Sequence, residues 1–152
     1  MLKDFEGWHP ALIDLISKFE VRDKWALFDL IHSEKYYRGR ICLMGDSAHA
    51  STPNLGAGAG MAMEDAYILS NLLGSINDAE NLETAFKAYD SVRRPRTQKV
   101  VVLSRLAGMA NEFVAPKIQD DLSKLQPDID ARYRWIWREN LEAQLAEAKR
   151  HM

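Results

Sequence analysis

One stretch of the sequence constrains this chain more than any other. Residues 39–65 read GRICLMGDSAHASTPNLGAGAGMAMED: a short apolar run that ends in an acid, then a loop rich in glycine and alanine. The apolar residues 41–44 predict a strand that runs from the edge of a sheet towards its core, with Asp46 just beyond its carboxyl end. Helical periodicity begins after the loop, so we expect a helix over residues 61–73.

The order strand, acid, glycine loop, helix is typical of a site for a nucleotide cofactor. Open α/β sheets bind ligands at the carboxyl ends of their strands, where Asp46 is expected. Gly56, Gly58 and Gly60 allow the backbone to approach a flat or charged ligand without an intervening Cβ atom. The first turn of the following helix carries N–H groups that have no partner within the helix, and these can face the same ligand.

The stretch resembles the second flavin-binding motif of the FAD-dependent aromatic hydroxylases, the group A flavin monooxygenases, and is most similar to the salicylate hydroxylase-like members. The motif is Gly45-Asp46, followed by His49, Pro53 and the glycine loop. The resemblance implies that Asp46 accepts hydrogen bonds from the ribityl hydroxyls of FAD and that Pro53 lies beside the flavin and the substrate. It also implies that the pyrimidine edge of the flavin meets the backbone of Gly58, Ala59 and Gly60.

The likeness continues through most of the chain, in Glu64-Asp65, Tyr89, the Arg93–Arg96 region and Trp135-Ile136-Trp137. It implies an enzyme that hydroxylates a phenolic or aromatic acid with dioxygen and with NADH or NADPH as the reductant. Reduction leaves negative charge on the flavin, and the positive end of a helix dipole can offset that charge without a basic side chain. We assign no catalytic side chain and no metal ligand.

The resemblance implies an α/β fold: the C-terminal part of a Rossmann-like FAD/NAD(P)-binding flavoprotein, with a few strands and a helix-rich C-terminal half. Residues 1–38 are expected to be the tail of a substrate-binding region. Residues 39–115 would be the FAD-binding segment, and residues 116–152 a C-terminal linker and helix. The 152 residues contain no Gly-x-Gly-x-x-Gly turn after a strand, so contacts to the ADP half of FAD are expected from a missing N-terminal FAD-binding part.

Outside the motif, Pro10 is placed to open a helix, and Pro95 is expected to interrupt one. Asn81 can cap the helix before that break, and Gly74 is the expected C-cap of the helix over 61–73. The remaining expectations are a helix over 10–20, a strand over 25–31, helices over 82–92 and 96–114, a connection over 115–128 and a last helix over 129–149.

Composition excludes several functions. The formal net charge is −2 and the charges are mixed along the chain, which argues against nucleic-acid binding. No window approaches the roughly 20 apolar residues of a membrane span. Cys42 is the single cysteine, so neither a disulfide framework nor a thiolate metal site is available. We therefore expect a cytoplasmic protein. The resemblance implies a small aromatic substrate, and a homo-oligomer or the missing N-terminal FAD-binding part as the protein partner.

Several alternatives stay open at this stage. His49 is expected to have a structural role, and the arginines at 93, 94 and 96 are expected to form a solvated or dipole-complementing face. The Trp135 and Trp137 pair is expected in packing, with one ring partly exposed. A Gly-Asp-Ser esterase would use Ser47, but only His151 lies well downstream as a base. The chain could also be a non-catalytic fragment or FAD-binding module.

Overall fold

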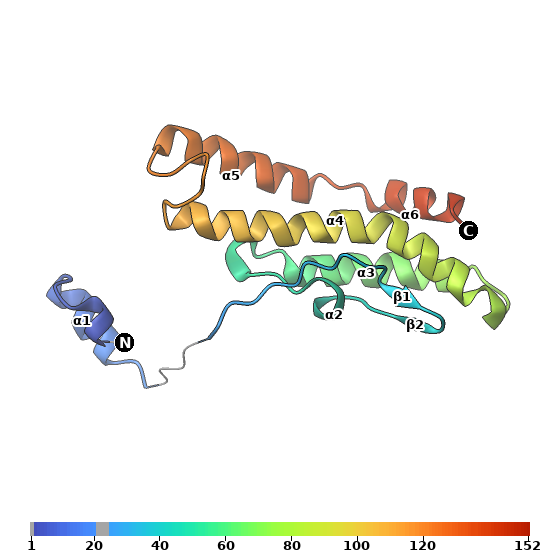
Figure 1. Ribbon diagram of the computed structural model, residues 1–152, viewed down its shortest axis with the longest axis horizontal. Coiled ribbons are helices and arrows are strands. Elements are labelled where there is room, and N and C mark those ends of the chain that lie inside the picture. Colours follow the sequence, from blue (N-terminus) through green and yellow to red (C-terminus); the bar gives the residue numbers. More distant parts are fainter. Residues whose placement is uncertain (1, 21–24) are drawn as a thin grey trace.

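A single long helix organises the fold of the computed structural model, which describes residues 2–20 and 25–152; residues 1 and 21–24, within the expected 1–38 segment, lie outside the description. This helix is α4, Leu82–Asn111. It packs against α3 (Gly58–Leu73) and α6 (Leu141–Arg150), and α5 (Leu122–Trp137) lies along its C-terminal half (Figure 1). The prediction of a helix-rich C-terminal half is confirmed.

The N-terminal residues form a separate small unit in Figure 1. A 3-10 turn, η1 (Leu2–Phe5), packs against α1 (Pro10–Ser17), and the Phe5 and Trp8 rings meet edge to face with centroids 5.3 Å apart. Pro10 opens α1 as expected, because its fixed φ suits a first helical position and its missing N–H costs nothing there. The helix ends three residues earlier than the predicted residue 20.

The strands are shorter than the sequence predicts. Within residues 2–20 and 25–152, only β1 (Tyr37–Arg38) and β2 (Ile41–Cys42) form, as an antiparallel pair in which Tyr37 opposes Cys42. The strand predicted over 25–31 is wrong, because that segment has no strand to pair with among the described residues. Its backbone link to the bundle is a hydrogen bond from Leu30 N–H to the carbonyl of Ala50. The predicted burial of residues 41–44 is also only partial, since Ile41 is 69% exposed.

Apolar side chains from α3, α4 and α6 form the main core beside the hairpin. Its fully buried members are Tyr36, Ala48, Ile68, Leu72, Ala85, Ala88, Tyr89 and Ala148. A second cluster fills the space between the short 3-10 turn η2 (Pro53–Leu55), α4 and α5, with Leu55, Met61, Val100, Ala107 and Ile136. The two clusters fix the 45–60 stretch against the helical bundle from both sides.

Pro95 does not interrupt α4, so the prediction of two helices separated near Arg94 is wrong. Proline in a helix removes one hydrogen bond and crowds the preceding turn. Here the residues on both sides of Pro95 are held by buried contacts, since Arg93 and Arg96 are nearly inaccessible to solvent. Tertiary contacts therefore outweigh the local preference. The helix begins at Leu82, with Asn81 at the N-cap position but without a side-chain hydrogen bond.

The C-terminal region contains two helices in place of the single helix predicted over 129–149. Asp121 caps α5 by accepting the Ser123 N–H, so the helix starts well before the predicted boundary and contains Pro127. Asn140 caps α6 in the same manner, with its Oδ1 atom 3.0 Å from the Ala143 nitrogen. At the other end of the bundle, Gly74 is the C-cap of α3, as predicted.

Candidate functional site

The acid of the motif stands at the start of a one-turn helix, α2 (Asp46–His49), because Gly45 turns the chain sharply before it. Gly45 has φ 58° and ψ −143°, a conformation that an L residue with a Cβ atom rarely adopts. The glycine of the Gly-Asp pair is thus required by the backbone itself. Asp46 follows as the first helical residue, and its side chain is exposed to solvent.

The amide-rich start of α3 lies next in the chain. The structure corrects the predicted boundary, because Gly58, Ala59 and Gly60 form the first turn of α3 instead of a loop before Met61. The N-cap residue is Ala57, which has no side-chain oxygen to accept a hydrogen bond from this turn. The first hydrogen bond of the helix runs from Met61 N–H to the Ala57 carbonyl. The three preceding amides are therefore open to an external acceptor.

The glycines differ in what the protein itself requires of them. Gly56 adopts a left-handed conformation with φ 60° at the end of η2, where a side chain would be strained. A Cβ atom at Gly60 would meet nothing within 4 Å, and one at Gly58 would make ordinary contact with Ser51 Oγ at 3.7 Å. The packing of the described residues therefore does not account for glycine at 58 and 60, which leaves room for a ligand in front of the helix.

The beginnings of α2 and α3 are adjacent. A Cβ atom built on Gly45 would lie 3.4 Å from the Cβ atom of Ala62, one turn into α3. Gly45 therefore lies against α3, and the exposed Asp46 follows it directly in the chain. A carboxylate accepts hydrogen bonds from hydroxyls, and helix amides donate to an electron-rich edge. Asp46 and the first amides of α3 can therefore bind one ligand that carries both hydroxyl groups and an electron-rich edge.

Pro53 is placed in η2, and α4 fixes the residues on either side of it. Ser104 is buried, and its hydroxyl donates to the carbonyl oxygen of Thr52 at 2.5 Å. Further along, the Asn54 side chain sits over Gly108, where a Cβ atom would come within 3.1 Å of the Asn54 amide group. Glycine at 108 therefore provides the notch into which Asn54 packs.

A buried carboxylate beneath α2 is the part of the site that the sequence interpretation missed. Asp65 is fully buried. Its Oδ2 atom accepts the Gly45 N–H at 2.9 Å and the His49 Nε2–H at 2.6 Å, and its Oδ1 atom accepts the Arg93 Nε–H at 2.7 Å. Because an ionised carboxylate only accepts, the proton in the His49 contact lies on Nε2. The expected structural role of His49 is confirmed.

Arg93 and Arg96 extend this network towards the C-terminal helices. Arg93 also donates to Glu64 at 2.7 Å, and Arg96 binds the same carboxylate through Nε and Nη2, both at 2.7 Å. Arg96 further reaches Glu139 at 3.0 Å. The prediction of a solvated arginine face is therefore wrong for Arg93 and Arg96. It holds only for Arg94, which is one-third exposed and pairs with Asp90 one turn away.

Charge balance keeps the two acids of this network ionised. Burial alone raises the pKa of Asp65, but the hydrogen bond from His49 and the charge of Arg93 outweigh burial and lower it. Burial likewise opposes ionisation of Glu64, and the Arg96 hydrogen bonds and the Arg93 charge lower the pKa of that carboxyl. The Glu64-Asp65 pair and the arginines were visible in the sequence, but nothing in their spacing of 28 to 32 residues indicated contact.

The contacts of Ser47, His49 and His151 argue against the esterase alternative. The Ser47 hydroxyl donates to the Met44 carbonyl at 2.8 Å, and His49 directs Nε2 to Asp65. His151, the only downstream candidate base, lies 3.2 Å from Glu147 at the end of α6. As expected for the tryptophan pair, one ring is exposed, that of Trp137. The other packs against Lys99, whose Nζ atom lies 3.9 Å from the centroid of the Trp135 ring.

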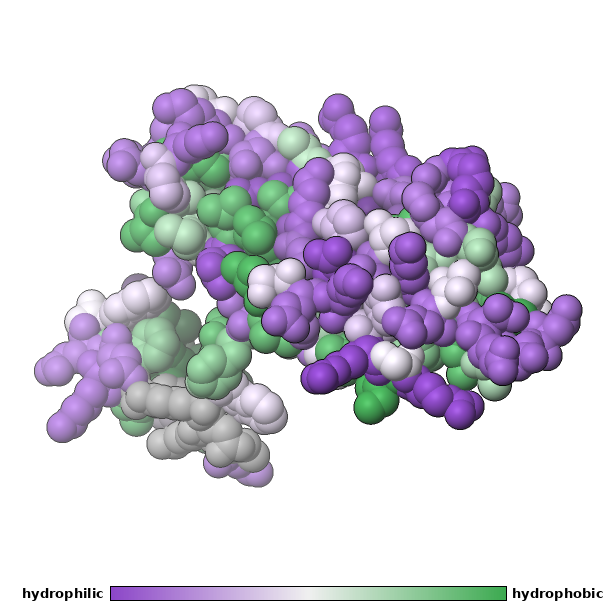
Figure 2. All heavy atoms as spheres, turned by 45° about the vertical axis from the view of Figure 1, so that its right-hand side comes forward, coloured by the Kyte–Doolittle hydropathy of each residue, from purple (hydrophilic) through white to green (hydrophobic). Residues whose placement is uncertain are grey.

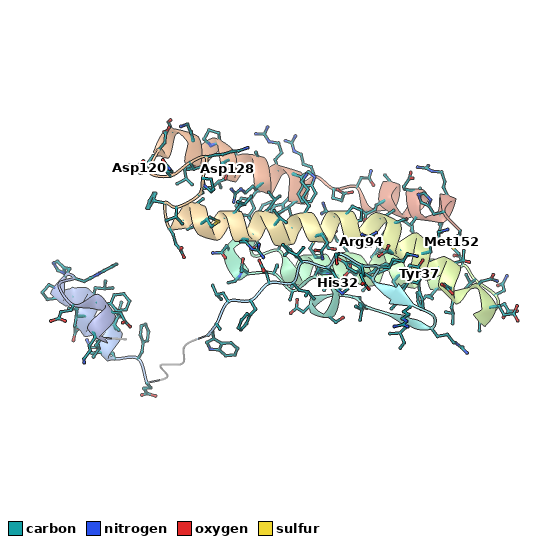
Figure 3. All side chains as sticks on the ribbon, viewed as in Figure 1. His32, Tyr37, Arg94, Asp120, Asp128 and Met152 are labelled. Atoms are coloured by element: carbon teal, nitrogen blue, oxygen red, sulfur yellow. The ribbon has the colours of Figure 1, made fainter. Side chains whose placement is uncertain are left out.

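An open cleft of about 790 Å³ lies elsewhere, between the β1–β2 hairpin and α4. Its lining includes Tyr37 and Arg94, both labelled in Figure 3, but neither Asp46 nor any residue of the α3 start. Its lining combines apolar side chains of the hairpin region, such as Ile41 and Leu43, with charged ones, such as Glu83. We therefore place the candidate cofactor site at the start of α3 and not in this cleft.

An uncapped helix start is a binding site for negatively charged groups, and many proteins that bind nucleotide cofactors use one in this way. Comparison with known proteins agrees. Residues 14–104, more than half of the chain, match the FAD binding domain family. The chain belongs to this family, and FAD is the cofactor that the family binds. The resemblance to FAD-dependent aromatic hydroxylases is likewise confirmed, as the following similarities show.

A salicylate hydroxylase of Pseudomonas putida is 40% identical to this chain over 150 residues, which are 98% of this chain and 35% of that protein. A 6-methylsalicylate 1-monooxygenase of Aspergillus terreus is 37% identical over 145 residues, 95% of this chain and 32% of that protein. A solved salicylate hydroxylase substrate complex superposes with a TM-score of 0.77 at 41% identity, covering 82% of this chain and 30% of the other. The chain thus spans about a third of the length of these relatives.

A more distant structure shows the same fold. Klebsiella pneumoniae HpxO, solved with FAD and uric acid, has a TM-score of 0.63 at 23% identity over 98% of this chain and 38% of that one. None of the helices in the described part of the chain has the length and apolar character needed to cross a membrane.

Proposed function

We propose that this chain is the flavin-facing C-terminal part of an FAD-dependent monooxygenase that hydroxylates a phenolic or aromatic acid with dioxygen and NADH or NADPH. The similarity to the salicylate hydroxylase of P. putida and to the 6-methylsalicylate monooxygenase supports this reaction and this substrate class. The division into a substrate-region tail (1–38), an FAD-binding segment (39–115) and a C-terminal part (116–152) belongs to the same proposal, as do the Rossmann-like sheet and a cytoplasmic location.

The observation that carries the proposal is the pairing of exposed Asp46 with the uncapped first turn of α3. Asp46 would accept hydrogen bonds from the ribityl hydroxyls, while the amides of residues 58–60 would face the pyrimidine edge of the isoalloxazine. Pro53, held by its neighbours Thr52 and Asn54, would border the substrate. When bound, FAD supplies the redox chemistry that activates dioxygen. The residues of this chain bind and orient the reactants and stabilise charge.

The residues present fit such a cofactor. Gly60 faces open space where a Cβ atom would stand, so a flat ring can approach the backbone there. The start of α3 carries roughly half a positive charge in its free amides, which suits the negative edge of a reduced flavin. The side chain of Asp46 is exposed, so it does not pack in the protein core. It also takes no part in the ion pairs that Asp65 forms with His49 and Arg93.

The surface also favours contact with an adjoining part of a larger assembly. Trp25 is 85% exposed and Phe28 is 80% exposed, and both lie on the extended segment that precedes the hairpin. Figure 2 shows hydrophobic side chains on the N-terminal segment and on the neighbouring end of the bundle. Isolated apolar side chains on a surface are ordinary, but several large ones together favour a partner surface. We propose the N-terminal FAD-binding part as this partner, with a second copy of the chain as the alternative.

A chimera provides the sharpest test. The matching third of P. putida salicylate hydroxylase is replaced by these 152 residues, and the purified protein is scanned for flavin absorbance and assayed for substrate-dependent NADH and NADPH oxidation. Bound flavin with product formation supports the monooxygenase. Bound flavin with no turnover on any aromatic acid favours a non-catalytic FAD-binding module. A folded chimera without flavin contradicts the proposal, and flavin-free ester hydrolysis would restore the esterase alternative.

A further inference from the structure

We propose that Asp65 is a positioning residue for the flavin site: its carboxylate holds both ends of α2 and thereby places Asp46. This inference rests on the proposed function, since it assigns Asp65 an indirect role in FAD binding. The Oδ2 atom of Asp65 accepts from the Gly45 amide, just before α2, and from the Nε2 atom of His49, the last residue of α2. The two contacts bracket the helix that begins with Asp46.

The shortness of α2 makes these contacts decisive. A helix of four residues cannot be stable alone, because forming the first turn costs more conformational entropy than one or two hydrogen bonds return. Its internal hydrogen bonds run from the amides of Ala48 and His49 to the Gly45 carbonyl and from Ala50 to the Asp46 carbonyl. The orientation of the turn is therefore set by what holds its ends, and Asp65 holds both.

Arg93 fixes Asp65 in turn. The Arg93 side chain is fully buried, with Nε on Asp65 at 2.7 Å, Nη1 on Glu64 and Gln144, and Nη2 on the Met61 carbonyl at 3.2 Å. Each of its nitrogen atoms is engaged, so the guanidinium cannot rotate without losing several hydrogen bonds. The carboxylate of Asp65 is thus anchored from α4 on one oxygen and presents the other oxygen to α2.

Asp65→Asn tests the role, because asparagine keeps the size of the side chain but cannot accept on both sides. The matched control is Asp90→Asn. Asp90 is also buried, accepts the Tyr36 amide at 2.9 Å and pairs with Arg94, so these hydrogen bonds do not involve α2. We expect amide hydrogen exchange at Gly45, Ala48, His49 and Ala50 to accelerate at least about tenfold in Asp65→Asn and to stay unchanged in Asp90→Asn. Unchanged exchange in Asp65→Asn overturns the proposal.

A second arm asks whether Asp65 acts through Asp46. FAD affinity of the full 152-residue chain is measured by NMR titration for the wild type, Asp65→Asn, Asp46→Ala and the double variant. Loss of a hydrogen bond to a charged group weakens binding about tenfold or more, so each single variant should show such a loss. We expect the double variant to bind within about twofold of Asp46→Ala. Multiplied losses would overturn the positioning role.

The two arms separate the inference from the proposed function. A wild-type chain that binds no FAD counts against the proposed function, while the exchange measurement still decides whether Asp65 holds α2. If Asp65→Asn does not fold, His49→Leu replaces it and removes the hydrogen bond at the end of α2, because leucine cannot donate to Asp65. Faster exchange at His49 and Ala50 in that variant supports the proposal, and unchanged exchange overturns it.

Discussion

The hydroxyl of Ser104 donates a hydrogen bond to the carbonyl oxygen of Thr52, 52 residues earlier in the chain, and fixes the residue before Pro53. The Thr52 hydroxyl also lies 3.1 Å from Ser104 Oγ, so Ser104 contacts both the side chain and the backbone carbonyl of Thr52. This contact and the Asp65 contacts attach two parts of the candidate flavin site to the helical bundle independently.

Replacing Ser104 by alanine should lower the free energy of unfolding by about 1–3 kcal/mol, because the Thr52 carbonyl loses its partner in a buried setting. Urea unfolding measures the loss, and amide exchange across residues 52–56 should increase with it. Ser91→Ala is the matched control, since the Ser91 hydroxyl donates only to the Ala88 carbonyl of its own helix. Equal effects of the two substitutions would contradict the anchoring role of Ser104.

Gly60→Ala should have opposite effects on stability and on flavin binding. Alanine favours the first turn of α3 over glycine by about 0.5–1 kcal/mol, and its methyl group meets nothing within 4 Å, so the melting temperature should rise. The same methyl group would occupy the space proposed for the flavin ring and weaken FAD binding. Ser70→Ala, at an exposed position further along α3, should leave FAD affinity unchanged. Unimpaired FAD binding by Gly60→Ala would place the flavin elsewhere.

The isolated chain should bind FAD, FMN and riboflavin with similar affinity. The proposed contacts reach the ribityl chain and the isoalloxazine, whereas the ADP half of FAD has no site assigned on this chain. Parallel NMR titrations with the three flavins compare their dissociation constants. A strong preference for FAD over riboflavin would mean that these 152 residues also bind the adenine nucleotide, contrary to the proposed division of the site.

Acid should destabilise the fold through Glu64 and Asp65. Both carboxyls have pKa values lowered from their ordinary 4.5 and 3.8, so their stabilising contribution is complete above about pH 4.5 and is lost as the pH falls through the folded-state pKa values. Melting temperatures measured from pH 6 to pH 3 should decline below pH 4.5. Glu64→Gln, which cannot titrate, should reduce the steepness of that decline. A melting temperature that rises in this range would contradict the assignment.

Cys42 should be almost unreactive in the folded protein. Burial, reinforced by the negative charges of Asp90 and Asp65, raises the pKa of its thiol from 9.0 to about 12. Since the thiolate is the reacting species, a disulfide reagent at pH 8 should modify the folded chain about a thousandfold more slowly than the chain in concentrated urea. Comparable rates in the two conditions would show that the β2 region opens readily.

The sequence predicted some helix starts and ends correctly, but it did not predict features that depend on contacts between residues far apart in the chain. Pro10 and Gly74 occupy the helix start and the helix end that their chemistry predicts. The continuity of α4 through Pro95 could not be predicted in this way, because it depends on buried partners far away in the chain. The same holds for the strand predicted over 25–31, whose apolar residues indicated burial that the described residues do not provide.

The same distinction between local features and distant contacts applies to the candidate site. Asp46 and the glycines were identifiable because motif residues lie close together in the sequence, and their roles towards FAD stay predictions. Asp65, Arg93 and Ser104 were not identified as part of the site, since their importance lies in pairings across 20 to 52 residues. Asn140 shows the intermediate case: its capping role is local, yet the capping signal could be used only once the end of α5 at Trp137 was known.

Arg93, Ser104 and Gly108 follow one another along a single side of α4, eleven and four residues apart, and contact Asp65, Thr52 and Asn54 respectively. One inserted residue between Arg93 and Ser104 would turn everything beyond it by about 100° and swing the Thr52 anchor out of reach. Length variation between relatives should therefore be excluded from this span and collect in the turn between Asn111 and Leu122.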